Sequence, residues 1–334
     1  MLPEVRKLKI TRFLAAFICL AILICSLSSC DSFSAKDNKV VLTVGDYEVT
    51  RDLYYYITEN LKRDLPDADR EEIDREAFDM LCEIYAVFAL AEDFGIADDD
   101  KYIASQVDEA VALKIEECGS KAKYKKALEE NHMTDNVYRF LEKHSRTADE
   151  VLSAIFQSGK YPSDEDGILA LCMSDEFVCV KQILVKSKNS KATGEDAYFI
   201  SGEEHTDEEA LAIAEKARGK AEKGADFDSL VAQYGEAFYM FNNTNGYYVC
   251  RGMWEQENED AVFALGEGEI SPVIKSDIGY SVFLRCEKSE SYVRSRIDDI
   301  AESYYQAQYN LLLEKQIGEL SVETTEAFDT IEEK

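Results

Sequence analysis

The hydrophobic pattern of this chain changes once along its length, at residues 158–175. Before this segment, long stretches carry apolar residues at helical spacing, and after it short alternating runs are mixed with helical stretches. The segment itself contains Gly159, Pro162 and Gly167 among serines and acidic residues, a composition typical of a domain boundary. The pattern therefore predicts an α+β chain with a helical first domain and a mixed second domain.

The first domain is predicted over residues 40–157. Two short alternating runs around Gly45 and Asp46 indicate a hairpin at residues 40–50. Helical segments are expected after it at residues 51–65, 77–94, 98–118, 121–130 and 134–156.

The second region combines the alternating apolar pattern of strands with the helical spacing of apolar residues. Strands are predicted at residues 177–185, 247–250 and 280–286, and helices at residues 207–222, 226–234 and 259–265. Ile297, Ile300 and Tyr304 then recur on one face of a long C-terminal helix, as expected for a helix that packs against a core.

The charge of the chain limits its partners. Among 334 residues, 37 Lys and Arg stand against 67 Asp and Glu, a formal net charge of −30. A chain this acidic repels the phosphates of nucleic acids, so DNA and RNA are excluded as partners. With 46% hydrophobic residues, 16 Gly and only 4 Pro, the chain is predicted to fold rather than to be disordered or fibrous.

The first 29 residues resemble a bacterial lipoprotein signal peptide. Residues 13–27 are an uncharged apolar run, shorter than the roughly 20 residues that a membrane-spanning helix needs. The run ends in Leu27-Ser28-Ser29-Cys30, which is similar to the lipobox whose cysteine carries the diacylglycerol, while bulky Ile24 makes Cys25 a weaker candidate. Residues 30–39 would be a polar tether. A plain membrane anchor without lipid is the alternative. Four basic residues precede the run: Arg6, Lys7, Lys9 and Arg12.

No metal or cofactor site is predicted. The three histidines, His132, His144 and His205, have no neighbours at ligand spacing, and His205, in a loop, is expected to be exposed. There is no phosphate-binding glycine loop and no serine nucleophile elbow. Export would permit disulfides, but free thiols are favoured for the six cysteines after Cys30, four of which lie in apolar stretches. These six are Cys82, Cys118, Cys172, Cys179, Cys250 and Cys286.

Residues 176–289 resemble a parvulin-type (PpiC-like) peptidyl-prolyl isomerase domain. Four segments match in the order of the family: VKQILVK, EEALAIAEKARGKAEKGADFDSLVAQYG, NGYYVCRGMW and EDAVFALGEGEISPVIKSDIGYSVFLR. The last is the most specific, because its FAL turn, its Gly-Glu-Ile-Ser and its Gly-Tyr pair before a strand are hard to reach by chance. The resemblance implies a small antiparallel sheet with flanking helices.

The domain order is similar to that of the PrsA/SurA group of extracytoplasmic foldases. In that group the last helix packs on the N-terminal helices and completes a split chaperone domain. The resemblance thus implies a helical SurA-like chaperone domain formed by residues 40–157 and the helix at 290–320. The parvulin domain would be inserted after a linker at 158–175, and residues 321–334 would be an acidic tail.

The family's two histidines are replaced in this sequence. Gln182 stands in the first strand and Ser281 follows the Gly-Tyr pair, while Ser276 keeps the family's Ser/Thr. These three are the expected catalytic positions. Gln182 and Ser281 are expected to face each other on adjacent antiparallel strands and to share one hydrogen bond. They would form either the altered floor of a pocket that still functions or a polar pair in a pocket that no longer functions. Ser276 is either a catalytic residue or a turn residue.

The substrate-binding positions follow from the same resemblance. The apolar residue of the proline pocket falls on Met253 or Trp254, and the pocket phenylalanine falls on Asn258, which removes apolar wall. Trp254 would contact the proline ring or be partly buried in the core. Phe263 keeps the buried phenylalanine of the FAL turn, and the family's acidic or cysteine position falls on Glu236 or on the alanine after it.

These features together predict a membrane-tethered extracytoplasmic foldase with peptidyl-prolyl cis-trans isomerase activity. Its partners would be unfolded or newly exported polypeptides with X–Pro segments, the membrane through the lipid, and a second copy of the chain in a homodimer. The alternative is an inactive holdase chaperone that only binds extended client segments. A solute-binding lipoprotein is excluded because the sequence lacks the βαβ pattern of two lobes.

Overall fold

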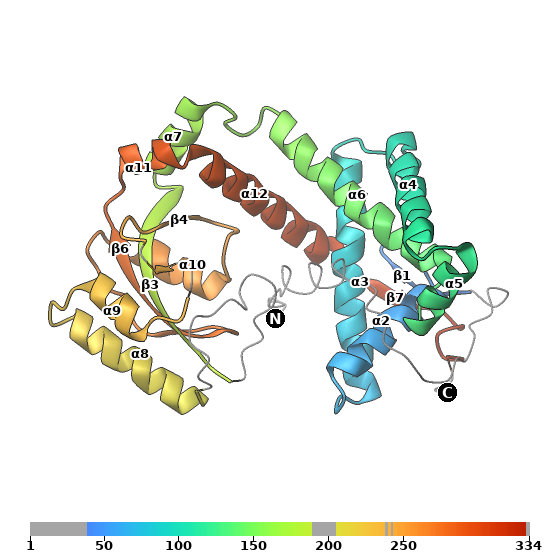
Figure 1. The fold of residues 1–334 in the computed structure, drawn as a ribbon, viewed down its shortest axis with the longest axis horizontal. Coiled ribbons are helices and arrows are strands. Elements are labelled where there is room, and N and C mark those ends of the chain that lie inside the picture. Colours follow the sequence, from blue (N-terminus) through green and yellow to red (C-terminus); the bar gives the residue numbers. More distant parts are fainter. Residues whose placement is uncertain (1–38, 189–204, 238–239, 242, 332–334) are drawn as a thin grey trace. The chain divides into compact units, whose positions relative to one another are not determined.

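The computed structural model describes residues 39–188, 205–237, 240–241 and 243–331 (Figure 1). These residues form two compact units, one of residues up to 154 together with residues from 312 onward, the other of residues 155–311. The predicted α+β class is confirmed, because helices predominate and two small sheets are antiparallel. The expected signal peptide and Cys30 lie outside the described residues. In the part of the chain that is described, no helix has the length and apolar character needed to span a bilayer.

The first unit contains a three-stranded sheet in the order β2-β1-β7. Strands β1 (Val40–Val44) and β2 (Tyr47–Thr50) form the predicted hairpin, whose turn residue Gly45 has a φ of 55°. Strand β7 (Val322–Thr324) pairs with β1, so the prediction that residues 321–334 are only an acidic tail is wrong. The acidic residues of this segment alternate with apolar ones that pack on the core. The Phe328 ring, for example, lies 5.3 Å from that of Tyr54.

Among the described residues, five helices follow the hairpin in this unit and enclose its core together with the end of the C-terminal helix. Helix α3 begins at Arg70, seven residues before the predicted start, because the Asp69 side chain caps it by accepting a hydrogen bond from the Glu72 amide at 2.9 Å. The helices are α2 (Arg51–Asp64), α3 (Arg70–Asp93), α4 (Lys101–Glu117), α5 (Lys121–Glu130) and α6 (Asp135–Gln157).

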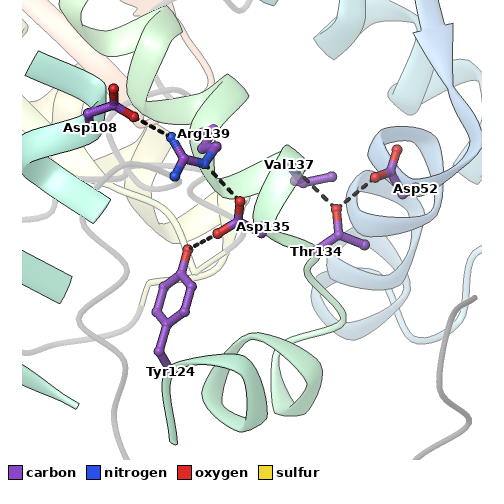
Figure 2. Close-up of polar contacts among 7 residues, drawn as sticks. All are labelled: Asp52, Asp108, Tyr124, Thr134, Asp135, Val137 and Arg139. Atoms are coloured by element: carbon purple, nitrogen blue, oxygen red, sulfur yellow. Dashed lines mark hydrogen bonds and ion pairs between the residues drawn. The ribbon is translucent and has the colours of Figure 1, made fainter. Parts of the chain in front are cut away.

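Polar contacts join α6 to its neighbours (Figure 2). Arg139 on α6 donates to Asp108 on α4 at 2.7 Å and to Asp135 at 2.8 Å, and Tyr124 on α5 donates to Asp135 at 2.9 Å. The start of α6 is joined to α2 as well, because the Thr134 hydroxyl donates to buried Asp52 at 2.7 Å.

The second unit is built on a four-stranded antiparallel sheet in the order β4-β3-β6-β5. Helices α8 and α9 pack against one face through small and apolar residues, and α10 packs against the other (Figure 1). The strands are β3 (Phe177–Lys186), β4 (Tyr247–Cys250), β5 (Ile274–Lys275) and β6 (Gly279–Cys286). The helices are α7 (Glu165–Met173), α8 (Asp207–Ala221), α9 (Phe227–Tyr234), α10 (Gln256–Ala264), α11 (Glu290–Ser295) and α12 (Ile297–Glu319).

Two sequence expectations about this unit need correction. The expected linker at residues 158–175 contains helix α7. The C-terminal helix α12 does not pack only on the N-terminal domain: the Tyr304 ring lies 6.0 Å from that of Phe177, at the start of β3. Only the end of α12 belongs to the first unit, where Gln316 donates to Asp93 at 2.7 Å. Of the three residues expected on the apolar face, Tyr304 is buried, whereas Ile297 and Ile300 are only partly buried. The spacing also did not reveal which unit this face covers.

Candidate functional site

The centre of the candidate site is a polar pair on the two middle strands of the second sheet. Gln182 on β3 is 4% exposed, Ser281 on β6 is fully buried, and the Gln182 amide nitrogen donates to the Ser281 hydroxyl at 2.9 Å. The hydrogen bond predicted from the sequence is therefore present.

Gln182 and Ser281 are not directly opposed in the register of the two strands. Gln182 is opposed to Phe283, and Ser281 is opposed to Leu184. Gln182 and Ser281 are thus diagonal neighbours on one face, a separation of roughly 7–8 Å between backbones that a long side chain can bridge. The long Gln182 side chain makes the contact possible.

Aromatic residues cover this face of the sheet. Trp254, in the segment between β4 and α10, stacks on Phe283 with ring centroids 5.6 Å apart and on Tyr247 at 5.8 Å. Since Phe283 is the residue opposed to Gln182, this aromatic stack is built on a direct neighbour of the polar pair. Met253 and Phe263 pack against the same hydrophobic cluster. The structure thus brings Met253, Trp254 and Phe263 together in one cluster, all three half-buried, and their contact with a proline ring stays a prediction.

A buried carboxylate holds the segment that carries Trp254, and the sequence reasoning did not identify it. Glu259 on α10 is 5% exposed and accepts a hydrogen bond from the Trp254 amide at 2.9 Å. Burial raises the pKa of Glu259, while hydrogen bonds from the Trp254 and Gly252 backbones act in the opposite direction. Because one acid is easily overlooked among 67, only the fold distinguishes Glu259.

Asn258, on which the resemblance predicts the family's pocket phenylalanine to fall, brings a polar atom to this side of the sheet. Its side chain is 8% exposed on the first turn of α10, and its carbonyl oxygen has no hydrogen-bond partner among the described residues. Buried polar atoms of folded proteins are nearly always hydrogen-bonded. The amide therefore replaces an apolar ring with an unsatisfied acceptor.

Glu236 lies along the edge of β3 beyond α9. Its amide donates to the Leu184 carbonyl at 2.8 Å, and its carboxylate accepts from the Lys186 amide at 2.6 Å. The second carboxylate oxygen lies 3.1 Å from the His205 ring nitrogen. His205, with a side chain 15% exposed, is therefore not the solvent-exposed loop residue that was predicted. Its partner comes from a segment far along the chain, which local sequence does not reveal.

Ser276 lies in the turn between β5 and β6, not in the polar pair. Its hydroxyl accepts from the Ile278 amide at 3.2 Å, and its own amide donates to the Gly279 carbonyl at 2.9 Å. These contacts favour the turn interpretation. A side chain at Gly279 would lie 2.2 Å from the Val185 carbonyl, so glycine is required where this turn enters β6.

The arrangement offers hydrogen bonds and an apolar wall, but no arranged metal ligands. No group of three or more His, Cys, Asp or Glu side chains suited to a metal ion occurs within the described residues. Gln182 and Ser281 donate and accept hydrogen bonds without changing charge near neutral pH, so the pair does not act by proton transfer. A site of this kind can hold a substrate in a chosen geometry.

Comparison with known proteins assigns families to both regions. Residues 1–151 match the family described as "SurA-like N-terminal domain", and residues 183–287 match the "PPIC-type PPIASE domain". The foldase protein PrsA of Staphylococcus aureus (strains MRSA252 and Newman) is 28% identical over 182 residues, which are 53% of this chain and 50% of each relative. The chain thus spans about half the length of the curated relatives it matches.

Solved structures of PrsA proteins are also similar. The crystal structure of PrsA from Bacillus anthracis is 19% identical, covering 72% of this chain and 96% of that one, with a TM-score of 0.34. The foldase protein PrsA from Streptococcus pneumoniae is 14% identical, covering 91% and 98%, with a TM-score of 0.32. The likeness to foldases is carried by the two domain matches and the curated relatives.

A double-mutant cycle tests the polar pair. Gln182→Leu and Ser281→Ala should each lower the free energy of unfolding by about 1–3 kcal/mol, because each leaves a buried polar group without this hydrogen bond. The double variant should lose clearly less than the sum, because both polar groups are then gone. Urea unfolding measures all three. Ser276→Ala, in the turn, is the matched serine control and should change stability by less than about 0.5 kcal/mol. Strictly additive losses would show that Gln182 and Ser281 are not coupled.

Proposed function

We propose that this chain is an extracytoplasmic foldase with peptidyl-prolyl cis-trans isomerase activity. The basis is that it combines a SurA-like N-terminal domain with a PPIC-type rotamase domain and is homologous to PrsA foldase proteins. Its substrates are X–Pro segments of unfolded or newly exported polypeptides. The observation that carries the proposal is the aromatic wall of Trp254 and Phe283 beside the buried hydrogen bond between Gln182 and Ser281.

The reaction suits such a site. Rotation about a peptide bond has a barrier of about 18–20 kcal/mol because amide resonance must be broken, and no bond is made or cut. An isomerase therefore needs to bind the twisted amide more tightly than the planar one. Neither a cofactor nor a metal ion is required for this.

Each group has a proposed role in that task. The half-buried Met253 and Trp254 contact the proline ring, and Phe263 supports them from the same cluster. Gln182 and Ser281 set the floor of the site, because both are buried and hydrogen-bonded to each other. Slow X–Pro isomerisation limits the folding of many chains, so a catalyst at the site of export accelerates their maturation.

A holdase chaperone is the second candidate, and Asn258 favours it. An unsatisfied amide oxygen stands where the family has an apolar ring, and both family histidines are replaced. In this alternative the domain binds extended segments of client chains without accelerating their rotation, and a homodimer would present two such surfaces.

Tethering to the membrane is part of the proposal. Removing residues 1–29 takes away 4 of 37 basic and 1 of 67 acidic residues, leaving 33 against 66 and a net charge of −33. An anionic membrane surface would repel this chain. A diacylglycerol on Cys30 would hold it at the outer face of the bacterial membrane, with residues 30–39 as a tether.

Exchange spectroscopy tests the isomerase. With a short Ala–Pro peptide, catalytic amounts of the protein should accelerate cis-trans exchange measured by magnetisation-transfer NMR. Trp254→Ala should slow this catalysis by about threefold to tenfold, the effect of losing an aromatic contact. Restoring the family's residues with Gln182→His, Ser281→His and Asn258→Phe should raise it. Glu208→Gln, on the exposed surface of α8, is the control and should not change the rate.

The outcome distinguishes the two candidates. No acceleration by stoichiometric protein would rule out the isomerase, and suppression of the aggregation of an unfolded client would then support the holdase. An unchanged rate in the folded triple variant would show that these positions do not form the pocket.

A second experiment tests the tether. Cys30→Ala should abolish lipidation, so the chain remains unprocessed or is lost from the membrane fraction. Fractionation and the mass of the N-terminal peptide measure both effects. Cys25→Ala is the matched control and should be processed normally. Membrane retention of a Cys30→Ala chain that is still cleaved after Ser29 would contradict the lipid anchor.

A further inference from the structure

Two cysteines face each other across the middle of the second sheet. Cys179 on β3 is directly opposed to Cys286 on β6 in the antiparallel register, and both are free thiols. Directly opposed residues of such strands have Cα atoms about 4.5–5.5 Å apart. A disulfide requires a Cα separation of about 4.4–6.8 Å, so the backbone already meets this condition.

The two thiols differ in access to solvent. Cys179 is fully buried, and its sulfur contacts the backbone oxygen of Asn245 at 3.1 Å. Cys286, at the end of β6, is half-buried. The neighbouring Cys179 thiol and, less strongly, the charge of Lys181 lower the pKa of Cys286, while burial and the charge of Asp228 act in the opposite direction. The neighbouring Cys286 thiol together with burial raises the pKa of Cys179, whose S–H donates to the Asn245 carbonyl. Cys286 is thus the accessible and more acidic thiol, with Cys179 protonated beside it.

We propose that Cys179 and Cys286 form a redox-active pair that closes to a cross-strand disulfide by exchange with an external disulfide, either a small molecule or an oxidised protein. The Cys286 thiolate attacks one sulfur of the external disulfide, whose S–S bond breaks and releases the first thiolate. Cys179 then loses its proton and attacks the Cys286 sulfur, releasing the second. The two cysteines lose two electrons and two protons, and the external disulfide gains them as two thiols.

The bond would join the strands that carry the polar pair. Cys179 lies three residues before Gln182, and Cys286 five residues after Ser281. The closed loop would enclose nearly all of the region that matches the rotamase domain, residues 183–287. Closing so long a loop restricts the unfolded chain strongly, so the oxidised domain should be the more stable form. This chemistry is independent of isomerase activity, and only its occurrence in the cell depends on the proposed extracytoplasmic location.

Peptide mapping tests the pair. The full-length protein is reduced, exposed to oxidised glutathione, alkylated and digested without reductant, and mass spectrometry identifies the linked peptides. The wild type should lose two thiols and yield one peptide pair joined through Cys179 and Cys286. Cys286→Ser should abolish the link. Cys250→Ser is the matched control and should keep it, because Cys250 is buried and opposed to Phe177, not to another cysteine.

Either of two results would overturn the proposal. One is a folded wild-type protein in which both thiols stay fully alkylatable after oxidation. The other is glutathione that remains on Cys286 without transfer to Cys179. Thermal unfolding provides a second readout: the midpoint of the oxidised wild type should rise and should return after reduction, with no rise in Cys286→Ser. An oxidised protein that melts at the same or a lower temperature would contradict a native cross-strand bond.

Discussion

The second unit depends on one strand that is hydrogen-bonded along both edges and buried on both faces. Strand β3 pairs with β4 and β6, and beyond the end of β4 its edge is continued by Glu236. A polar side chain in such a strand must find a partner, because an unsatisfied buried group is costly. Gln182 donates to Ser281, and this buried hydrogen bond is the centre of the candidate site.

The neighbours of β3 explain why the site can bind without transferring protons. Trp254 stacks on Phe283 of β6 and is held at its backbone by Glu259 of α10, so the sheet and the helix together support the apolar wall. Gln182 and Ser281 exchange a hydrogen bond but lack the two-ring geometry of paired histidines. Because isomerisation requires only tighter binding of the twisted amide, the loss of those rings changes the shape of the floor more than the chemistry. The unsatisfied side-chain oxygen of Asn258 is the feature of this face that most opposes the proposed contact with a proline ring.

The sequence predicted well what local rules determine. Apolar runs located β3 and β6, and the resemblance to parvulins implied that Gln182 and Ser281 lie within reach of each other. The start of α3 was missed by seven residues, although the Asp69 cap that fixes it is local. The register between β3 and β6 was not predicted. Alternation fixes the face of the sheet on which a residue lies, but not which residue of the neighbouring strand is opposed to it. The pairing of His205 with Glu236, the strand at residues 322–324 and the unit covered by Tyr304 all depend on contacts between distant segments. No local pattern records these contacts.

If the face of the sheet beside α10 binds X–Pro segments, as we propose, Trp254 reports on this binding directly, because it is the one tryptophan of the chain. The most direct measurement is a titration of its fluorescence with a peptide that contains Ala–Pro and no aromatic residue. The same peptide with alanine in place of proline is the control. If this face binds X–Pro segments, we expect a saturable change in Trp254 emission with the proline peptide and a much weaker change with the control peptide. No change, or the same change with both peptides, would contradict it.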